Sequence, residues 1–173
     1  MSEMNRTEAL IGSAAFFVLA PGTVAGLVPW LITRWRFGEG ATANVSVVGA
    51  LVIALALALL IECFLRFAIK GSGTPAPVAP TNRLIVTGAY ARVRNPMYVA
   101  VTGLIFGQAL LFASAALVAY AIAVWLTFLM FVVYYEEPRL RRDYPEDYPA
   151  YFENVPRWRP RFRPWRQPGV AKS

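Results

Sequence analysis

Two short polar segments of the chain carry the residue types that could do chemistry. Residues 88–98 read GAYARVRNPMY, which places two arginines, an asparagine and two tyrosines directly before a long apolar run. The acidic pair Glu136-Glu137 follows the last apolar run. The first segment is basic and hydrogen-bonding, and the second is acidic. The two could build a binding site, or they could simply pair with each other as a solvated collar at the edge of a membrane.

The residue types that are missing narrow the chemistry further. The chain of 173 residues has no histidine and one cysteine, Cys63, which lies within an apolar run. Histidine is the commonest general base and the commonest metal ligand in proteins. No cluster of cysteine, aspartate and glutamate has the spacing of metal ligands. We therefore predict no metal site and no disulfide framework.

The apolar runs beside these segments predict membrane-spanning helices. The chain is 57% hydrophobic with a mean hydropathy of +0.47, whereas soluble domains are about 45–50% apolar. A helix needs about 20 apolar residues to cross the roughly 30 Å of hydrocarbon in a bilayer. We therefore predict an all-α integral membrane protein with about four transmembrane helices. These are residues 9–32, which Pro21-Gly22 and Pro29 should kink, 45–68, 96–112 and 115–134.

The last two apolar runs should form a tight antiparallel hairpin, because only Ala113-Ser114 separate them. Such a C-terminal hairpin brings residues 88–98 and Glu136-Glu137 to the same face of the membrane. Pro96 suits the first turn of the helix that opens the hairpin, where its missing N–H costs nothing. Asn95, directly before it, can cap that helix.

Other spacings predict how the helices pack. Gly103 and Gly107 form a GxxxG pair, which allows another helix to approach closely. Glu62 and Arg66 lie four residues apart on one helical face, so we expect them to pair near the end of the second apolar run. We divide the chain into two parts of one integral unit. Residues 1–70 hold the two N-terminal transmembrane helices, and residues 71–173 hold the long loop, the hairpin and the C-terminal segment.

The basic residues predict the orientation in the membrane. The net charge is +7, from 17 basic and 10 acidic residues, and most of the bases lie at residues 66–94 and in the C-terminal tail. Cytoplasmic loops of membrane proteins carry an excess of lysine and arginine. We therefore predict cytoplasmic N- and C-termini, with both polar segments on the cytoplasmic side. In residues 157–166 arginines alternate with aromatic residues, which is typical of contact with lipid headgroups and not of nucleic-acid binding.

The order of these motifs resembles the isoprenylcysteine carboxyl methyltransferase family, which is grouped with the phospholipid N-methyltransferases. The shared pattern is (T/S)-G-x-Y-x-x-x-R-(H/N)-P-x-Y, an apolar hairpin, E-E, a stretch of spaced tyrosines and V-P. It covers roughly residues 82–156. The matching residues are Thr87, Gly88, Tyr90, Arg94, Pro96, Tyr98, Glu136, Glu137, Tyr144, Tyr148, Tyr151, Val155 and Pro156.

The resemblance implies a cytoplasmic pocket for S-adenosylmethionine (SAM), which would leave as S-adenosylhomocysteine. Arginine and backbone N–H groups suit the carboxylate of SAM, a glutamate suits its ammonium group, and tyrosine rings suit its sulfonium and adenine. The resemblance implies catalytic roles for Arg94, Asn95 and Glu137. The implied cofactor-binding residues are Asn82, Arg83, Leu84, Ile85, Tyr90, Asn95, Pro96, Met97, Tyr98 and Glu136.

The implied reaction is methyl transfer from SAM to a lipophilic or amphiphilic acceptor at the interface of membrane and cytosol. The acceptor could be a prenylcysteine carboxylate, a thiol or a lipid amine. An amine would need a base, for which Glu137 and Tyr98 are the candidates. Asn95 stands where the family usually has histidine. Val132 stands where members that methylate prenylcysteine carboxylates have arginine, so the acceptor stays open.

Two alternatives from other functional classes stay open as well. Some membrane sterol and steroid reductases end with a similar basic-Pro-Tyr loop and bind NADPH instead. A non-catalytic membrane scaffold would use the GxxxG pair as its partner face. Binding of SAM would indicate a methyltransferase, binding of NADPH a reductase, and binding of neither a scaffold.

Overall fold

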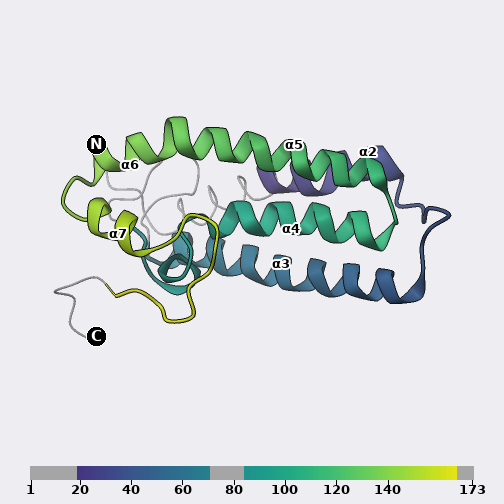
Figure 1. Cartoon of the computed structure of the whole chain (residues 1–173), viewed down its shortest axis with the longest axis horizontal. Helices are drawn as coiled ribbons and strands as arrows, with labels where there is room; N and C mark the ends of the chain where they lie inside the picture. The colour runs from purple at the N-terminus through teal and green to yellow at the C-terminus, as the bar shows by residue number, and fades with distance from the viewer. Residues whose placement is uncertain (1–18, 71–83, 167–173) are drawn as a thin grey trace.

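Three long helices lie side by side in the computed structural model, which describes residues 19–70 and 84–166 (Figure 1). They are α3 (Ala43–Lys70), α4 (Pro96–Leu111) and α5 (Ala115–Phe131). The described residues contain no strand. The prediction of an all-α chain is therefore confirmed for this part of the protein.

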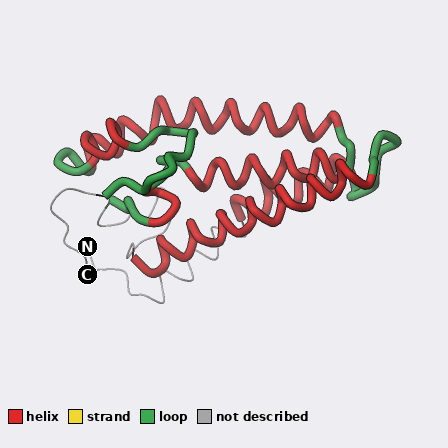
Figure 2. The backbone as a smooth tube through the Cα atoms, turned by 60° about the horizontal axis from the view of Figure 1, so that its bottom comes forward, coloured by secondary structure: helices red, strands yellow, loops and turns green. Residues whose placement is uncertain are grey.

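The shorter elements lie mostly around the ends of these helices, where the connecting loops also gather (Figure 2). The element η3 and helix α6 continue α5 without a break, so one rod runs from Ala115 to Asp143. This rod is longer than the predicted segment 115–134, because the charged residues that follow the apolar run stay helical. The shorter elements are the π-helix η1 (Thr23–Leu27), α2 (Val28–Thr33), the 3-10 helix η2 (Gly88–Ala91), the π-helix η3 (Val132–Glu136), α6 (Glu137–Asp143) and α7 (Tyr148–Asn154).

Helices α3 and α4 pack closely because small residues face each other between them. A Cβ atom added at Gly49 would collide with the backbone of Gly107 and Leu111, and one added at Gly107 would collide with Ile53. A Cβ atom at Gly103 would press against Ala56. The close helix approach that the GxxxG pair predicts is therefore confirmed, and α3 is the partner helix.

The connection between α4 and α5 is as tight as the sequence predicts. Ala113 takes a positive φ of 49°, and the Ser114 side chain caps α5 by accepting a hydrogen bond from the Leu117 N–H at 3.3 Å. A serine at this position satisfies one of the unpaired N–H groups in the first turn of a helix. The hairpin returns the chain to the end from which α4 starts, so the two polar segments meet there.

The first described helix is irregular where its prolines predict a kink. The π turn η1 lies between Pro21 and Pro29. The Tyr120 hydroxyl donates to the Val24 carbonyl at 3.0 Å, and the Gln108 side chain donates to the Ala25 carbonyl at 2.7 Å. Polar side chains of α4 and α5 thus bond the backbone of this turn, which suits an irregular helix in an apolar surrounding. Residues 9–18 of the predicted segment lie outside the described residues.

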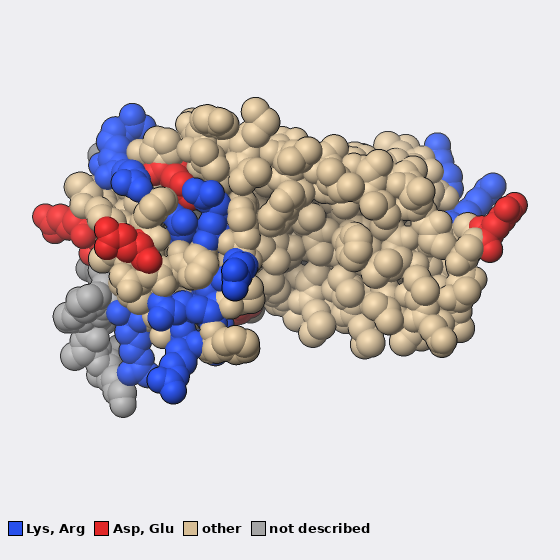
Figure 3. Space-filling model, in the orientation of Figure 1, with Lys and Arg blue, Asp and Glu red and all other residues tan. Residues whose placement is uncertain are grey.

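Two described helices are long and apolar enough to cross a membrane, Ala43–Arg66 and Ala115–Asp143. The other two apolar helices, Leu19–Thr33 and Pro96–Leu111, are shorter. Figure 3 shows a broad uncharged body between charged ends. Large apolar side chains on it are exposed, among them Leu51, Leu55, Ile122 and Leu126. A surface of this kind suits lipid better than water, while four crossings stay a prediction.

Charged side chains gather at both ends of the body, and far more of them lie at the end formed by α6, α7 and the C-terminal segment (Figure 3). The opposite end carries Arg34, Arg36 and Glu39 in the connection between α2 and α3. We call the end formed by α6, α7 and the C-terminal segment the polar end. It contains residues 84–98 and Glu136-Glu137, and a separate small core of Val86, Tyr148, Tyr151 and Val155 holds it together.

Candidate functional site

The loop that leads into α4 is fixed at its start by a glycine and a membrane-helix glutamate. Gly88 has φ of 65°, a left-handed conformation that glycine adopts without steric cost. The Ala89 N–H donates to the Glu62 carboxylate at 3.2 Å, and Arg66 also donates to Glu62 at 3.1 Å. The predicted Glu62–Arg66 pair is confirmed, and the structure adds that Glu62 connects α3 to the loop.

Tyr90 packs under this loop and is nearly enclosed. Its side chain lies in a buried cluster with Cys63 and Ala89. Its backbone carbonyl accepts a hydrogen bond from the Tyr151 hydroxyl at 2.7 Å, which joins the loop to α7. Burial raises the pKa of the Tyr90 phenol well above its usual range, so the phenol keeps its proton at neutral pH. In the structure Tyr90 is therefore a neutral aromatic side chain that packs between α3 and the loop before α4.

Arg94 and Asn95 link the loop to the C-terminal segment. The Arg94 N–H donates to the Pro156 carbonyl at 2.9 Å, and its guanidinium carbon lies 4.0 Å from the centre of the Phe152 ring. Asn95 is 6% exposed, and its side-chain amide donates to the Arg157 carbonyl at 3.2 Å. Asn95 does occupy the N-cap position of α4, but its side chain makes no capping hydrogen bond. The prediction that it caps α4 is wrong, because the side chain is oriented so that its NH2 group donates to the Arg157 carbonyl and its oxygen accepts from no N–H group of the first turn.

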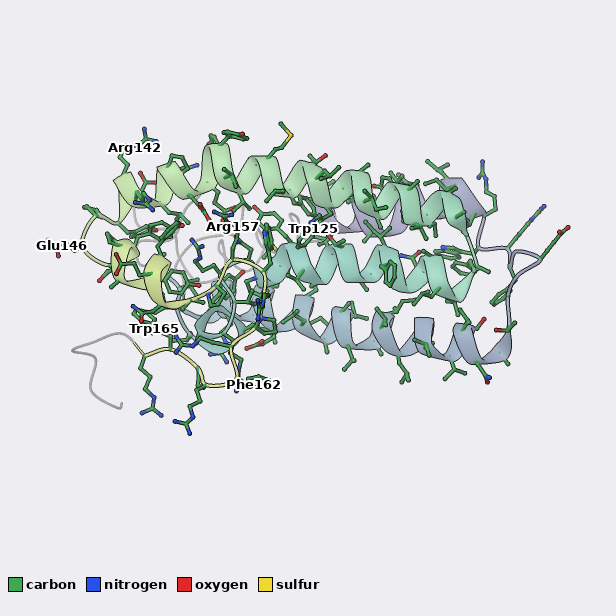
Figure 4. All side chains as sticks on the ribbon, viewed as in Figure 1. Trp125, Arg142, Glu146, Arg157, Phe162 and Trp165 are labelled. Carbon is green, nitrogen blue, oxygen red and sulfur yellow. The ribbon has the colours of Figure 1, made fainter. Side chains whose placement is uncertain are left out.

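Glu137 is the ionic centre of the polar end. It is 7% exposed and accepts one hydrogen bond from Arg94 at 3.1 Å and two from Arg157 at 2.7 and 2.9 Å. Two parallel N–H···O bonds from one arginine form the strongest and most directional kind of ion pair. Arg157 comes from the C-terminal segment and lies beneath the rod formed by α5 and α6 (Figure 4). The hydrogen bond to Glu137 raises the pKa of Arg157.

Glu136 points to a different partner from its neighbour. The Tyr98 hydroxyl donates to the Glu136 carboxylate at 2.7 Å, and the Tyr98 ring stacks at 4.7 Å from the ring of Phe128. Both glutamates lie at the end of the π turn η3 or directly after it. A π turn inserts an extra residue into a helix and so changes which side chains face a neighbour, and such turns are frequent at functional sites. Here it accompanies two consecutive carboxylates that both contact residues 94–98.

The remaining predicted cofactor residues divide between two clusters. Ile85 and Met97 pack against the buried cluster that contains Tyr90, and Leu84 packs against the core of the polar end. Pro96 is fully buried at the start of α4. The predicted residues Asn82 and Arg83 lie outside the described residues. Nothing in the structure tests the assigned roles themselves, which stay predictions.

Arg157 is the functional candidate that sequence reasoning missed. It supplies two of the three hydrogen bonds from arginine to Glu137 and holds Asn95 through its carbonyl. The available signal was its place directly after the Val155-Pro156 pair. Two of the spaced tyrosines in the family pattern, Tyr148 and Tyr151, lie in the core of the polar end and stabilise its packing.

The residues present fit a ligand that carries a carboxylate. The Arg94 side chain is 9% exposed, and its Nε atom is buried without a hydrogen-bond partner among the described residues. A buried donor of this kind normally has a partner. The Thr87 hydroxyl is a second buried polar atom without a described partner. Across residues 19–70 and 84–166, no group of three or more acidic, cysteine or histidine side chains could hold a metal ion.

Comparison with known families identifies the chain. A family model for phospholipid methyltransferase matches residues 45–147, which is more than half of the chain and runs from α3 to the turn before α7. No curated protein and no solved structure matches the chain. The match agrees with the family that the motif order resembles, and it favours a methyltransferase over the reductase and scaffold alternatives. The chain belongs to the phospholipid methyltransferase family and is a membrane methyltransferase.

Proposed function

We propose that this protein transfers a methyl group from SAM to the amine of a membrane lipid, at the polar end of the helix bundle. The observation that carries the proposal is the buried network in which Arg94 and Arg157 hold Glu137 while Tyr98 holds Glu136. The hairpin brings Arg94 to Glu137 across 43 positions and Tyr98 to Glu136 across 38 positions, all within the family match. Arg157 joins them from the C-terminal segment beyond that match. A collar of solvated ion pairs would not bury Glu137 to 7% exposure.

The residues of this network have complementary roles toward SAM. The Nε atom of Arg94, which has no hydrogen-bond partner within residues 19–70 and 84–166, offers a donor for its carboxylate. The Glu136 carboxylate offers an acceptor for its ammonium group. The neutral rings of Tyr90 and Tyr98 offer faces for its sulfonium and adenine. When bound, SAM supplies a methyl group that one in-line displacement can pass to a nucleophile, so the protein contributes chiefly proximity and orientation.

The acceptor follows from the family and from one apolar position. Val132 is fully buried and stands where relatives that act on prenylcysteine carboxylates have arginine. Without that cation, an acceptor carboxylate has no evident partner there. The family description names phospholipids, and this supports a lipid headgroup amine.

The lipid amine must lose one proton before its lone pair can attack the methyl group. The sulfur of SAM then leaves as the neutral thioether of S-adenosylhomocysteine, and the methylated nitrogen carries the positive charge. Glu137 already accepts hydrogen bonds from two arginines, which suits it to hold the loop in place. Tyr98 donates to Glu136 at 2.7 Å. Tyr98 is therefore the better-placed candidate: its oxygen would take up the amine proton as its own proton passes to Glu136 Oε2, which leaves Glu136 Oε1 for the ammonium group of SAM.

The proposed topology has four crossings with the polar end in the cytosol. The two shorter apolar helices would cross beside the two long ones, because α4 packs along α3 and polar side chains of α4 and α5 bond η1. Cytosolic placement follows from the arginines at the polar end. A lipid would reach the site laterally between helices, and SAM would reach it from water.

The test is a methyl-transfer assay with the purified full chain in lipid nanodiscs and SAM that carries a labelled methyl group. Three acceptor classes are offered in parallel: a lipid amine, a prenylcysteine carboxylate and an amphiphilic thiol. We expect label in the lipid amine. Glu136→Gln should abolish it, whereas Glu146→Gln, a matched change on the exposed turn before α7, should leave it unchanged.

Label in the carboxylate or the thiol alone would refute the amine assignment and keep the methyltransferase. No label in any class, with SAM still bound, would mean that the acceptor lies outside these three classes. Equal activity of the Glu136 and Glu146 variants would refute the site.

A further inference from the structure

We propose that residues 157–166, which we call the arginine loop, form an anchor that inserts Phe162 into the membrane interface and binds anionic lipid headgroups. Apart from Arg157, which belongs to the buried network around Glu137, the proposed methyltransferase site does not use this loop, and the anchor is argued independently of the reaction. It rests on three features of the loop: its rigid attachment, its level along the helices, and the combination of side chains that it exposes.

The arginine loop is fixed to the loop that precedes α4. The Arg161 N–H donates to the Arg92 carbonyl at 2.9 Å, and the Arg92 guanidinium donates back to the Phe162 carbonyl at 2.6 Å. The Trp165 N–H donates to the Ala91 carbonyl at 2.8 Å, and the Trp165 ring packs on Tyr151. The loop is therefore held on both sides of its tip, so the position of Phe162 is set by the fold.

A tryptophan pair sets the level of the loop along the membrane helices. The Trp158 ring lies 4.4 Å from the ring of Trp125, a residue of the membrane-length helix Ala115–Asp143. Figure 4 shows Trp125 near the place where the polar end meets the apolar body. Tryptophan is enriched at the interface between hydrocarbon and water. The loop therefore runs at the height of the lipid headgroups.

The tip of the loop exposes an aromatic ring that the protein itself does not cover. Phe162 is 98% exposed, the highest value among the exposed large hydrophobic side chains in the described residues, and it projects outward from the loop in Figure 4. A fully exposed phenylalanine on a rigid backbone gains nothing from the folded protein. Removal from water by an apolar phase would stabilise it.

Arginines flank Phe162 along the loop, and several of them are not neutralised within the described protein. Arg159, Arg163 and Arg166 are exposed and make no ion pair with a described acidic side chain. Figure 3 shows basic side chains gathered beside the edge of the apolar body. Basic residues close to a membrane surface attract anionic lipids. Arginine in particular matches phosphate by bidentate hydrogen bonds.

The apolar tip decides between the anions that could bind here. A free phosphate would use the arginines but leave Phe162 in water. A single-stranded nucleic acid could stack a base on the ring, but the Trp125–Trp158 pair favours a position of the loop at the membrane interface. A bilayer with anionic lipids satisfies both, because its phosphates meet the guanidinium groups while its hydrocarbon boundary receives the ring.

The test places a fluorophore at the tip and reads its surroundings in vesicles. Phe162→Cys is labelled with an environment-sensitive dye in the otherwise complete chain. The native thiol, Cys63, is fully buried, and the unsubstituted chain labelled in parallel measures any reaction there. The matched control is Glu146→Cys, on an exposed turn far from the apolar body (Figure 4). Vesicles contain either phosphatidylcholine alone or phosphatidylcholine with phosphatidylglycerol, each with and without lipids that carry a quencher near the headgroup.

We expect a blue-shifted emission and strong quenching at position 162, and water-like emission without quenching at position 146. The effect at 162 should be larger with phosphatidylglycerol. Replacing Arg159, Arg163 and Arg166 with glutamine should remove that lipid dependence. Water-like emission at 162 in both vesicles would overturn the insertion. Equal insertion with and without anionic lipid, unaffected by the three substitutions, would overturn the headgroup binding.

Discussion

The buried carboxylate of Glu137 gives the sharpest prediction about stability. Glu137→Gln keeps the shape of the side chain and removes its charge. The Arg94 guanidinium, 9% exposed, and the Arg157 guanidinium, 30% exposed, then lose the carboxylate that neutralises them. The same change weakens the hydrogen bonds that tie the α5–α6 rod to the loop and to the C-terminal segment.

The size of the effect follows from the burial of the network. Removing one partner of a buried ion pair costs about 3–5 kcal/mol. Because Arg157 keeps access to water, we expect the lower end, about 3 kcal/mol. For a chain of about this length each kcal/mol lowers the Tm by roughly 2–4 °C, so the Tm should fall by roughly 6–12 °C. Arg157→Gln should cost less, because Arg94 still neutralises Glu137.

Thermal unfolding in detergent, followed by circular dichroism, measures the change. Glu146→Gln is the control, since Glu146 is exposed and has the same chemistry. The Glu146→Gln variant should have the same Tm as the unsubstituted chain. If Glu137→Gln unfolds at the same temperature as this control, the ionic network does not hold the polar end together and the reasoning fails.

Three further predictions concern the loop, the cofactor and pH. Gly88→Ala should lower the Tm by a few degrees and weaken S-adenosylhomocysteine binding. A left-handed φ costs a residue with a side chain about 1–2 kcal/mol, and the new Cβ atom would collide with the Glu62 side chain. The control Gly26→Ala, which places its Cβ atom in open space, should change neither the Tm nor the binding. Glu136→Gln should weaken S-adenosylhomocysteine binding, measured by calorimetry, far more than Glu62→Gln, and equal losses would contradict the assignment of the ammonium site. Burial raises the pKa of the Tyr148 phenol to about 12, so the folded state disfavours the phenolate more than the unfolded state does. The contribution of the protonated Tyr148 phenol to the free energy of unfolding is complete below about pH 10, the usual pKa of tyrosine. It is lost as the pH rises from there towards 12. A plot of Tm against pH should therefore be flatter in this range for Tyr148→Phe, and an unchanged slope would show that another group causes the alkaline loss.

Local rules were sufficient to predict the elements of the hairpin. A proline at the first turn, a GxxxG pair and a two-residue connection act over a few neighbouring residues, and the structure has Pro96, the Gly103–Gly107 face and the Ser114 cap where these rules place them. The hairpin spacing then brings residues 88–98 to Glu136-Glu137. That meeting is a consequence of helix length, which the apolar runs encode.

The details of the site depend on tertiary contacts that no local rule contains. Asn95 has the right type and place for a helix cap, but its side chain is oriented by the hydrogen bond that its NH2 group donates to the Arg157 carbonyl, and its oxygen makes no capping bond. Arg157 itself reaches Glu137 across 20 positions of sequence, and its place directly after Val155-Pro156 does not by itself indicate which residue it binds. Glu62 behaves as predicted toward Arg66, one helical turn away, but its bond to Ala89 spans 27 positions.

The most direct test of the account is calorimetric titration of the detergent-purified chain with S-adenosylhomocysteine, with NADPH titrated in parallel. The account predicts saturable binding of S-adenosylhomocysteine that Glu136→Gln weakens, and no binding of NADPH. Binding of NADPH alone, or of neither compound by the folded protein, would contradict a SAM site at the polar end.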